Sequence, residues 1–371
     1  MKMQDSLNNN AKKYSKIKHN IAIFEIFFTL LVLFAILATG LSRTIADFAI
    51  SINPNHFISV AFYLVIFGIM FNAVNFPVDY FSGYILEHRF NLSRQNFQSW
   101  LKDYFKKLLI SGVFYFIAIE ALYIFLRNAA DSWWLWTAGF YLFFSLVIAR
   151  IFPVFIIPLF YKLTKLEDEN LRQDILRLTK KANIKILDIY RIGLGEKTRK
   201  ANAALTGVGS SKRVLFSDTL LDNYTSDEIQ VTLAHELAHH KHKHFWKLIF
   251  FSFISTLFIL YLASVIFRIV ANDNMNMAIS YIGAFPILAF ILALFNVILM
   301  PVSAAISRYF EYQADREAVG LTKNKNAFVS LMQKLGSQNL SDPEPSKIVE
   351  LFFYDHPPTL KRIKAVKNLA L

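Results

Sequence analysis

The 371-residue chain contains no cysteine, and only 18% of its residues are charged. The absence of cysteine excludes disulfides, thiolate metal ligands and a cysteine nucleophile, so any metal site must use histidines and carboxylates. Soluble domains carry about 25% charged residues. Here 55% of the residues are hydrophobic and 37 are phenylalanine. A soluble core does not hold so many large apolar side chains, so the composition indicates an integral membrane protein.

The hydrophobic runs predict six membrane-spanning helices. Each is long enough to cross about 30 Å of hydrocarbon, which takes about 20 helical residues. The expected spans are residues 21–41, 57–78, 108–126, 133–160, 246–270 and 277–305. Glu25, Glu120 and Arg150 fall within them. These polar residues fit a hydrated cavity between the helices, and they fit equally well with snorkelling at a helix end or isolated polar contacts.

The spans divide the chain into five expected segments. They are a cytoplasmic arm (1–20), four spans with a basic cytoplasmic loop at 79–107 (21–160), a soluble α+β segment (161–245), two further spans (246–305) and a cytoplasmic carboxyl-terminal segment (306–371). Lysine and arginine number 40 against 27 acidic residues. In a membrane protein this excess marks cytoplasmic loops rather than nucleic-acid binding. We therefore expect both termini and the soluble segment on the cytoplasmic side of a plasma membrane, the inner membrane if the source is bacterial.

One motif in the soluble segment carries specific chemistry. A helix is expected to begin at Ser226 or Asp227, either of which is a suitable capping residue. Further along this helix, His235 and His239 are four residues apart, so both imidazoles project from one face and can share a Zn²⁺ ion. Glu236 lies beside them, where a carboxylate can take a proton from the water that such an ion activates.

A third ligand is needed, because a catalytic zinc site has three protein ligands and one open position. Glu311, at the end of the sixth span, can complete the set, and Asp315 one turn later can accept the second ring N–H of a ligating histidine. The alternative for both is a solvated helix face.

Other histidines near the motif have weaker signals. His240, His242 and His244 lie in a basic cluster before a span, which is typical of a membrane anchor, and we assign them no catalytic role. His356 is followed by two prolines that fix the backbone, so it can donate to an oxyanion with Arg362 in support, or it is an ordinary surface histidine.

Several ordered motifs together resemble the type I CAAX prenyl proteases, integral-membrane zinc metallopeptidases of the gluzincin class. They are Phe76-Pro77, residues 87–91 (EHRFN), Asn202-Ala203, residues 235–239 (HELAH), residues 307–315 (SRYFEYQAD) and His356-Pro357-Pro358. The resemblance implies helices that surround an intramembrane chamber, with a small α+β metallopeptidase domain on the cytoplasmic side.

The resemblance also implies roles for individual residues. His235, His239 and Glu311 would bind one zinc ion, and Glu236 would be the general base. His356 and Arg362 would assist at the substrate carbonyl. Asn202 and Ala203 would lie on an exposed strand edge, where the backbone of a hydrophobic peptide substrate pairs.

The chain departs from the eukaryotic members of that family in two ways. It has six expected spans where they have seven, and it lacks a long insertion before His235, so it resembles a compact bacterial homologue. Bacteria generally lack protein prenylation, so the peptide substrate need not be prenylated. Two alternatives remain: a quality-control zinc protease of the heat-shock-induced type, and a non-enzymatic membrane scaffold or transporter. The second is disfavoured because all four expected ligand and base residues are present.

Overall fold

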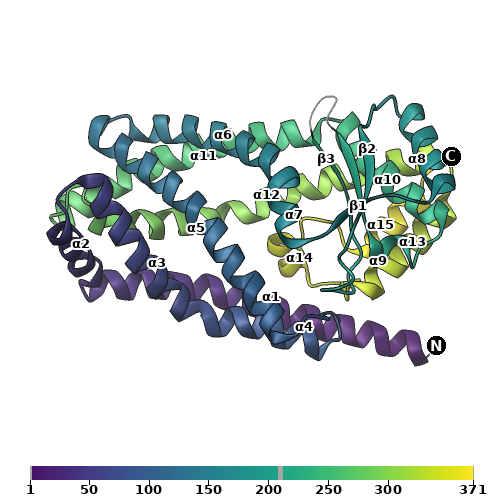
Figure 1. The fold of residues 1–371 in the computed structure, drawn as a ribbon, viewed down its shortest axis with the longest axis horizontal. Helices are drawn as coiled ribbons and strands as arrows, with labels where there is room; N and C mark the ends of the chain where they lie inside the picture. The colour runs from purple at the N-terminus through teal and green to yellow at the C-terminus, as the bar shows by residue number, and fades with distance from the viewer. Residues whose placement is uncertain (1, 208–211, 371) are drawn as a thin grey trace.

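The computed structural model describes residues 2–207 and 212–370. Long helices form one end of the molecule, and a small sheet with shorter helices forms the other (Figure 1). Both termini lie at the end that holds the sheet. The helical membrane fold with a small α+β unit, predicted from the sequence, is therefore confirmed.

Within the described ranges, six helices are long and apolar enough to cross a membrane. The helices of this region are α1 (Lys2–Ala38), α2 (Leu41–Ile52), α3 (His56–Tyr80), α4 (Leu86–Arg89), α5 (Phe97–Asn128), α6 (Trp133–Ile151), α7 (Ile157–Phe160), α11 (His244–Arg268) and α12 (Phe285–Thr322). Short π-helical turns at Phe81–Ile85, Phe152–Ile156 and Ile269–Asn274 continue α3, α6 and α11, and a 3-10 turn at Ile282–Ala284 precedes α12. The helix of the sixth span, α12, continues to Thr322, well beyond the expected end of that span at residue 305.

The helices extend further than the hydrophobic runs predicted. The expected polar arm is part of α1, and most of the expected loop at 79–107 is helical. Ala11 and Tyr14, three residues apart on one face of α1, are buried against Leu86, Leu92 and Leu340. Tertiary packing therefore keeps this polar segment helical, although its composition alone does not favour burial.

The unit beyond the membrane helices contains four strands and six helices among the described residues. They are β1 (Leu163–Lys165), α8 (Glu169–Lys181), β2 (Asp188–Ile192), β3 (Ala203–Thr206), β4 (Arg213–Ser217), α9 (Asp218–Leu221), α10 (Ser226–Lys241), α13 (Lys325–Gln338), α14 (Lys347–Phe353) and α15 (Thr359–Lys367). The strand order is β1-β2-β4-β3. The β2–β4 pair is parallel, and β1–β2 and β3–β4 are antiparallel. As the last strand of the described sheet, β3 has strand partners on one side only.

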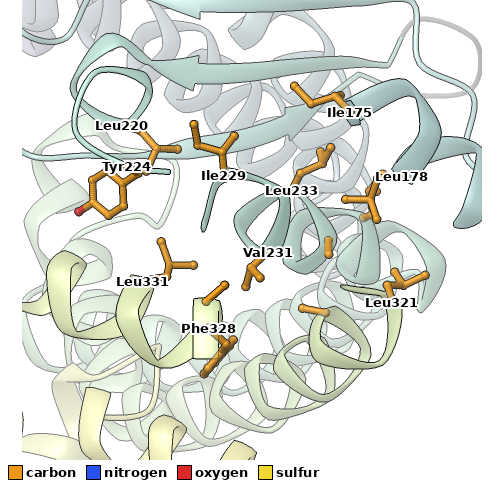
Figure 2. Packing of buried hydrophobic residues seen from close by; sticks show 14 of the residues in the cluster. Ile175, Leu178, Leu220, Tyr224, Ile229, Val231, Leu233, Leu321, Phe328 and Leu331 are labelled. Carbon is orange, nitrogen blue, oxygen red and sulfur yellow. The ribbon is translucent and has the colours of Figure 1, made fainter. Parts of the chain in front are cut away.

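A hydrophobic core surrounds α10 and fixes its position. Ile229, Val231 and Leu233 of this helix are at most 2% exposed. Figure 2 shows Val231 directed toward Phe328 and Leu331 of α13, whereas Leu233 lies on the side of α8. Burying each such side chain contributes roughly 1.5–3 kcal/mol. Because α10 packs on several sides, the polar residues that it carries are held in fixed directions.

Candidate metal centre and its cavity

The amino-terminal end of α10 is held by a capping box. The side chain of Thr225 accepts a hydrogen bond from the backbone of Glu228, and the Glu228 carboxylate accepts one from the Thr225 backbone at 2.8 Å. The expectation of a cap at Ser226 or Asp227 was therefore wrong by one or two residues. The threonine followed three residues later by glutamate was the signal that identifies the true cap. Glu228 also pairs with Lys334 of α13 at 2.7 Å.

The predicted ligands converge from two helices. Nε2 of His235 and Nε2 of His239 are 3.0 Å apart. Glu311 of α12 reaches both, with Oε2 at 3.2 Å from His235 and Oε1 at 3.2 Å from His239. All three ligand atoms lie within 4.8 Å of one another, and Glu311 is buried. The long α12 thus delivers a carboxylate to the helix that bears both histidines.

The residues fit a tetrahedral metal ion. Two nitrogen ligands at about 2.0–2.1 Å from one zinc lie about 3.3 Å apart, which agrees with the observed separations of 3.0–3.2 Å. In addition, Oε2 of Glu311 is buried in an orientation that gives it no hydrogen bond among the described residues. A buried carboxylate oxygen without a donor costs free energy, and a cation at this point would satisfy it.

Asp315 contacts the Nδ1 side of the His235 ring, and Arg362 in turn binds Asp315. Oδ1 of Asp315 is 3.0 Å from Nδ1 of His235. The Arg362 guanidinium donates two hydrogen bonds to the Asp315 carboxylate, at 2.8 and 2.5 Å. Burial disfavours the imidazolium form of His235, but the close Asp315 and Glu311 carboxylates outweigh it and raise the pKa of the metal-free ring to about 10. The carboxylates therefore make His235 a basic, oriented ligand.

The position of Arg362 bears on its expected role. Its side chain is largely buried, and its Nη2 lies 3.5 Å from Oε2 of Glu311 as well as against Asp315. Burial opposes its charge, but the neighbouring Asp315 and Glu311 carboxylates raise its pKa above the usual value. The bidentate contact with Asp315 favours a positioning role for Arg362. Direct assistance at the substrate carbonyl stays a prediction.

His239 has its own support, which the sequence reasoning missed. Its Nδ1 is 2.9 Å from Nδ1 of His244, and Nε2 of His244 is 3.0 Å from Oε1 of Gln313. The Gln313 amide is in turn 3.0 Å from Nδ1 of His242. His244 is 1% exposed, and its ring stacks on Phe310 with centroids 4.3 Å apart.

The hydrogen-bond roles in this chain are mutually consistent. A histidine that binds a metal through Nε2 keeps its proton on Nδ1. His239 can then donate to His244, which carries its own proton on Nε2 and donates to the carbonyl oxygen of Gln313. A left-handed turn at Lys243, with φ of 55°, separates α10 from α11 and directs His244 back toward the site.

His356 lies at the rim of the cluster. Its Nε2 is 3.4 Å from Oε1 of Glu311, and its Nδ1 is 2.9 Å from Asp355. The hydrogen bond to Asp355 raises the pKa of His356, against the effect of burial. Pro357 and Pro358 are buried, so the loop between α14 and α15 is anchored directly after this histidine. More than half of the His356 side chain is exposed, at 56%, which leaves the ring open to a bound molecule.

A cavity of about 620 Å³ connects these residues. His235, Glu236, His356 and Arg362 line it, and so do Asn202 and Ala203 at the start of β3. A volume of this size is typical of ligand sites. The backbone of Asn202 is fixed to the sheet, because its carbonyl accepts a hydrogen bond from Ser217 at 2.9 Å. Of the residues predicted for the site, His239, Glu311 and Asp315 are not among those that line the cavity. All three contact His235, which does line it.

Two regions of the chain match described families. Residues 165–370 match Peptidase family M48. Residues 2–162 match the CAAX prenyl protease N-terminal region, described as having five membrane helices. In this chain that region contains four of the six candidate spans and the shorter α2.

Similar proteins cover nearly the whole chain. An uncharacterized metalloprotease of Bacillus subtilis, YhfN, is 27% identical over 95% of this chain and 84% of its own length. CAAX prenyl protease 1 of Saccharomyces cerevisiae is 28% identical over 98% of this chain and 86% of its own. The crystal structure of S. mikatae Ste24p superposes with a TM-score of 0.87, at 24% identity, and covers 98% of this chain and 89% of that one. The last comparison supports the fold.

Proposed function

The chain belongs to Peptidase family M48 and is a multi-pass membrane metalloprotease. On that premise, we propose a role in peptide hydrolysis for each residue of the site. The observation that carries the proposal is the convergence of His235, His239 and Glu311 beside Glu236 in one cavity. The family implies a catalytic metal. We assign zinc, because two imidazoles and one carboxylate are a common ligand set of catalytic zinc sites.

His235, His239 and Glu311 would hold the ion. A zinc ion at such a site supplies Lewis acidity toward water and toward the scissile carbonyl. Asp315 and His244 orient the two imidazoles by accepting their Nδ1 protons. Orientation matters because a ligand must present its lone pair to the ion along a fixed direction.

Glu236 would move the proton during hydrolysis. It follows His235 on α10 and lines the same cavity. Its carboxylate would accept a proton from the attacking water and pass it to the leaving amine. His356, open to the cavity and anchored by its prolines, would donate to the developing oxyanion. Arg362 would act through Asp315 and Glu311, which it contacts.

The substrate would be a peptide in extended conformation. β3 has a strand partner on one side only among the described strands, and Asn202 and Ala203 at its start line the cavity. An added strand would place its backbone by main-chain hydrogen bonds, with little demand on side chains. The substrate class that we propose is therefore a hydrophobic peptide, prenylated or not, that can reach a site beside the membrane.

The orientation that we propose for the chain in the membrane rests on the distribution of its basic residues. Both termini lie at the same end of the molecule as α10, the helix that carries His235 and His239 (Figure 1). Short loops rich in lysine and arginine stay on the cytoplasmic side. We therefore place residues 161–245 and 306–371, which supply the ligands and the cavity, on the cytoplasmic face of the membrane, the inner membrane in a bacterium.

The test is peptide cleavage by purified, zinc-loaded protein in detergent. Prenylated and unprenylated versions of one peptide would be incubated with the wild type and with Glu236→Gln, and the products identified by mass spectrometry. The wild type should cleave, and Glu236→Gln should lose on the order of 10²–10⁴-fold in rate, as expected for removal of a general base. Full turnover by a metal-replete Glu236→Gln protein would refute the assignment.

A further inference from the structure

A second cleft, of about 540 Å³, lies outside the catalytic cavity. It is formed by the amino-terminal part of α1, the turn after α4, the loop before β3 and the end of α13. Three cationic side chains from separate segments line it: Lys13, Arg89 and Arg199. The remaining lining residues are polar or apolar, namely Asn10, Phe90, Asn91, Leu92, Ser337, Gln338 and Leu340. The described lining therefore contains three cations and no acidic residue.

Two nearby lysines have acidic partners, whereas the three cations of the cleft have none among the described side chains. Lys197 pairs with Asp103 at 2.5 Å, and Lys200 pairs with Glu87 at 2.8 Å. The side chains of Lys13, Arg89 and Arg199, which line the cleft, form no ion pair or hydrogen bond within the part of the chain whose side chains are described. Like charges around one concavity repel, and a bound anion would relieve this repulsion.

The cleft is also held in shape by the backbone around it. The backbone N–H of Arg199 donates to the carbonyl of Leu92 at 2.9 Å. Its carbonyl accepts from Nε2 of Gln338 at 2.6 Å. In the turn after α4, between Arg89 and Leu92, Asn91 adopts φ of 56°. Two of the three cationic segments are thus fixed to each other and to α13, so little ordering is needed for an anion to bind.

The position of the cleft along the membrane normal places it near the membrane surface. Lys13 precedes Ala38, the last residue of α1, by 25 residues, which corresponds to about 38 Å along a helix. The hydrocarbon core is about 30 Å thick, and the headgroup regions extend the bilayer to about 40–45 Å. If the far end of α1 marks one edge of the hydrocarbon, the backbone of Lys13 lies about 8 Å beyond the opposite edge, at the outer limit of the headgroup region. Its long side chain can reach the lipid phosphates from there.

We propose that this cleft binds a phosphate ester, the headgroup of an anionic phospholipid. The two guanidinium groups suit phosphate oxygens, to which arginine donates paired hydrogen bonds. The side-chain amides of Asn10 and Asn91, which line the same cleft, are further donors. A soluble phosphate has the same chemistry, but the position of Lys13 near the membrane surface favours the lipid. This site is separate from the metal centre and does not depend on the proposed hydrolytic roles.

The test is native mass spectrometry of the full chain, released from detergent after incubation with a defined lipid. The probes are dioleoyl phosphatidylglycerol, dioleoyl phosphatidylcholine and inorganic phosphate. The triple variant Lys13→Gln/Arg89→Gln/Arg199→Gln removes the cations of the cleft. The matched control, Lys12→Gln/Lys16→Gln/Lys102→Gln, removes three exposed charges from the same basic region without touching the cleft. Gel filtration and thermal midpoints verify that both variants fold.

The wild type should retain phosphatidylglycerol in preference to phosphatidylcholine. The cleft variant should lose about 100-fold in affinity for the anionic lipid, the combined effect of three basic residues near an anionic group. The control should change less than about threefold. Equal losses in both variants, or no preference for phosphatidylglycerol in the wild type, would overturn the proposal. Binding of inorganic phosphate in place of lipid, lost only in the cleft variant, would support the phosphate site and overturn its assignment to a lipid.

Discussion

Replacing Arg362 with methionine tests whether this arginine positions the metal ligands or acts on the substrate. The guanidinium donates to both oxygens of Asp315, at 2.8 and 2.5 Å, and Asp315 is 2% exposed. Methionine fills similar space but leaves this carboxylate buried with only the N–H of His235 beside it. Breaking a buried pair by removing one partner costs about 3–5 kcal/mol of unfolding free energy. Loosening Asp315 should also weaken metal binding about 10–100-fold.

The assay is a chelator competition for zinc together with denaturation in detergent. Lys361→Met is the matched control, because Lys361 precedes Arg362 and pairs with Glu350 at 2.6 Å while more than half exposed, at 54%. A surface pair contributes about 0–1 kcal/mol, so the control should retain its stability and zinc affinity. If Arg362→Met kept both properties and lost only kcat, the arginine would act on the substrate and the positioning argument would be refuted.

Three further predictions address separate parts of the site. His244→Ala should weaken zinc affinity about 10–100-fold in a chelator competition. His240→Ala, in the last turn of α10, should not, and equal effects would remove His244 from the support of the metal. Thr225→Ala should lower the free energy of unfolding by about 1 kcal/mol through loss of the cap. Ser226→Ala should change the same free energy by less than about 0.5 kcal/mol. A larger loss in Ser226→Ala than in Thr225→Ala would mean that Thr225 is not the cap. Removing zinc should lower the thermal midpoint, by an amount equivalent to about 2.7 kcal/mol at a zinc concentration 100 times Kd, and an unchanged midpoint would exclude preferential binding to the folded state.

The sequence was sufficient for the parts of the site that depend on local spacing. A four-residue interval on a helix places His235 and His239 on one face, and the same rule relates Glu311 to Asp315. Hydropathy located the spans because each must bury about 20 apolar residues in lipid. These features are properties of single helices, so no knowledge of long-range packing was required to predict them.

Other features depend on contacts between distant segments and could not be read from the sequence. His244 looked like part of a basic anchor, and only the turn at Lys243 and the stacking on Phe310 bring it to His239. The helical start of α1 depends on burial of Tyr14 against residues more than 70 positions away. Strand β1, with three residues, is too short for a periodic pattern and exists through its pairing with β2.

The most direct test of the central claim is the zinc content of purified protein, measured by inductively coupled plasma mass spectrometry. The wild type and Glu236→Gln should each contain one zinc per chain, because Glu236 is not a ligand. His239→Ala and Glu311→Ala should lose the ion, because each removes one of three ligand groups that lie within 4.8 Å of one another. Full zinc occupancy in Glu311→Ala, with the affinity of the wild type, would contradict the proposed metal centre.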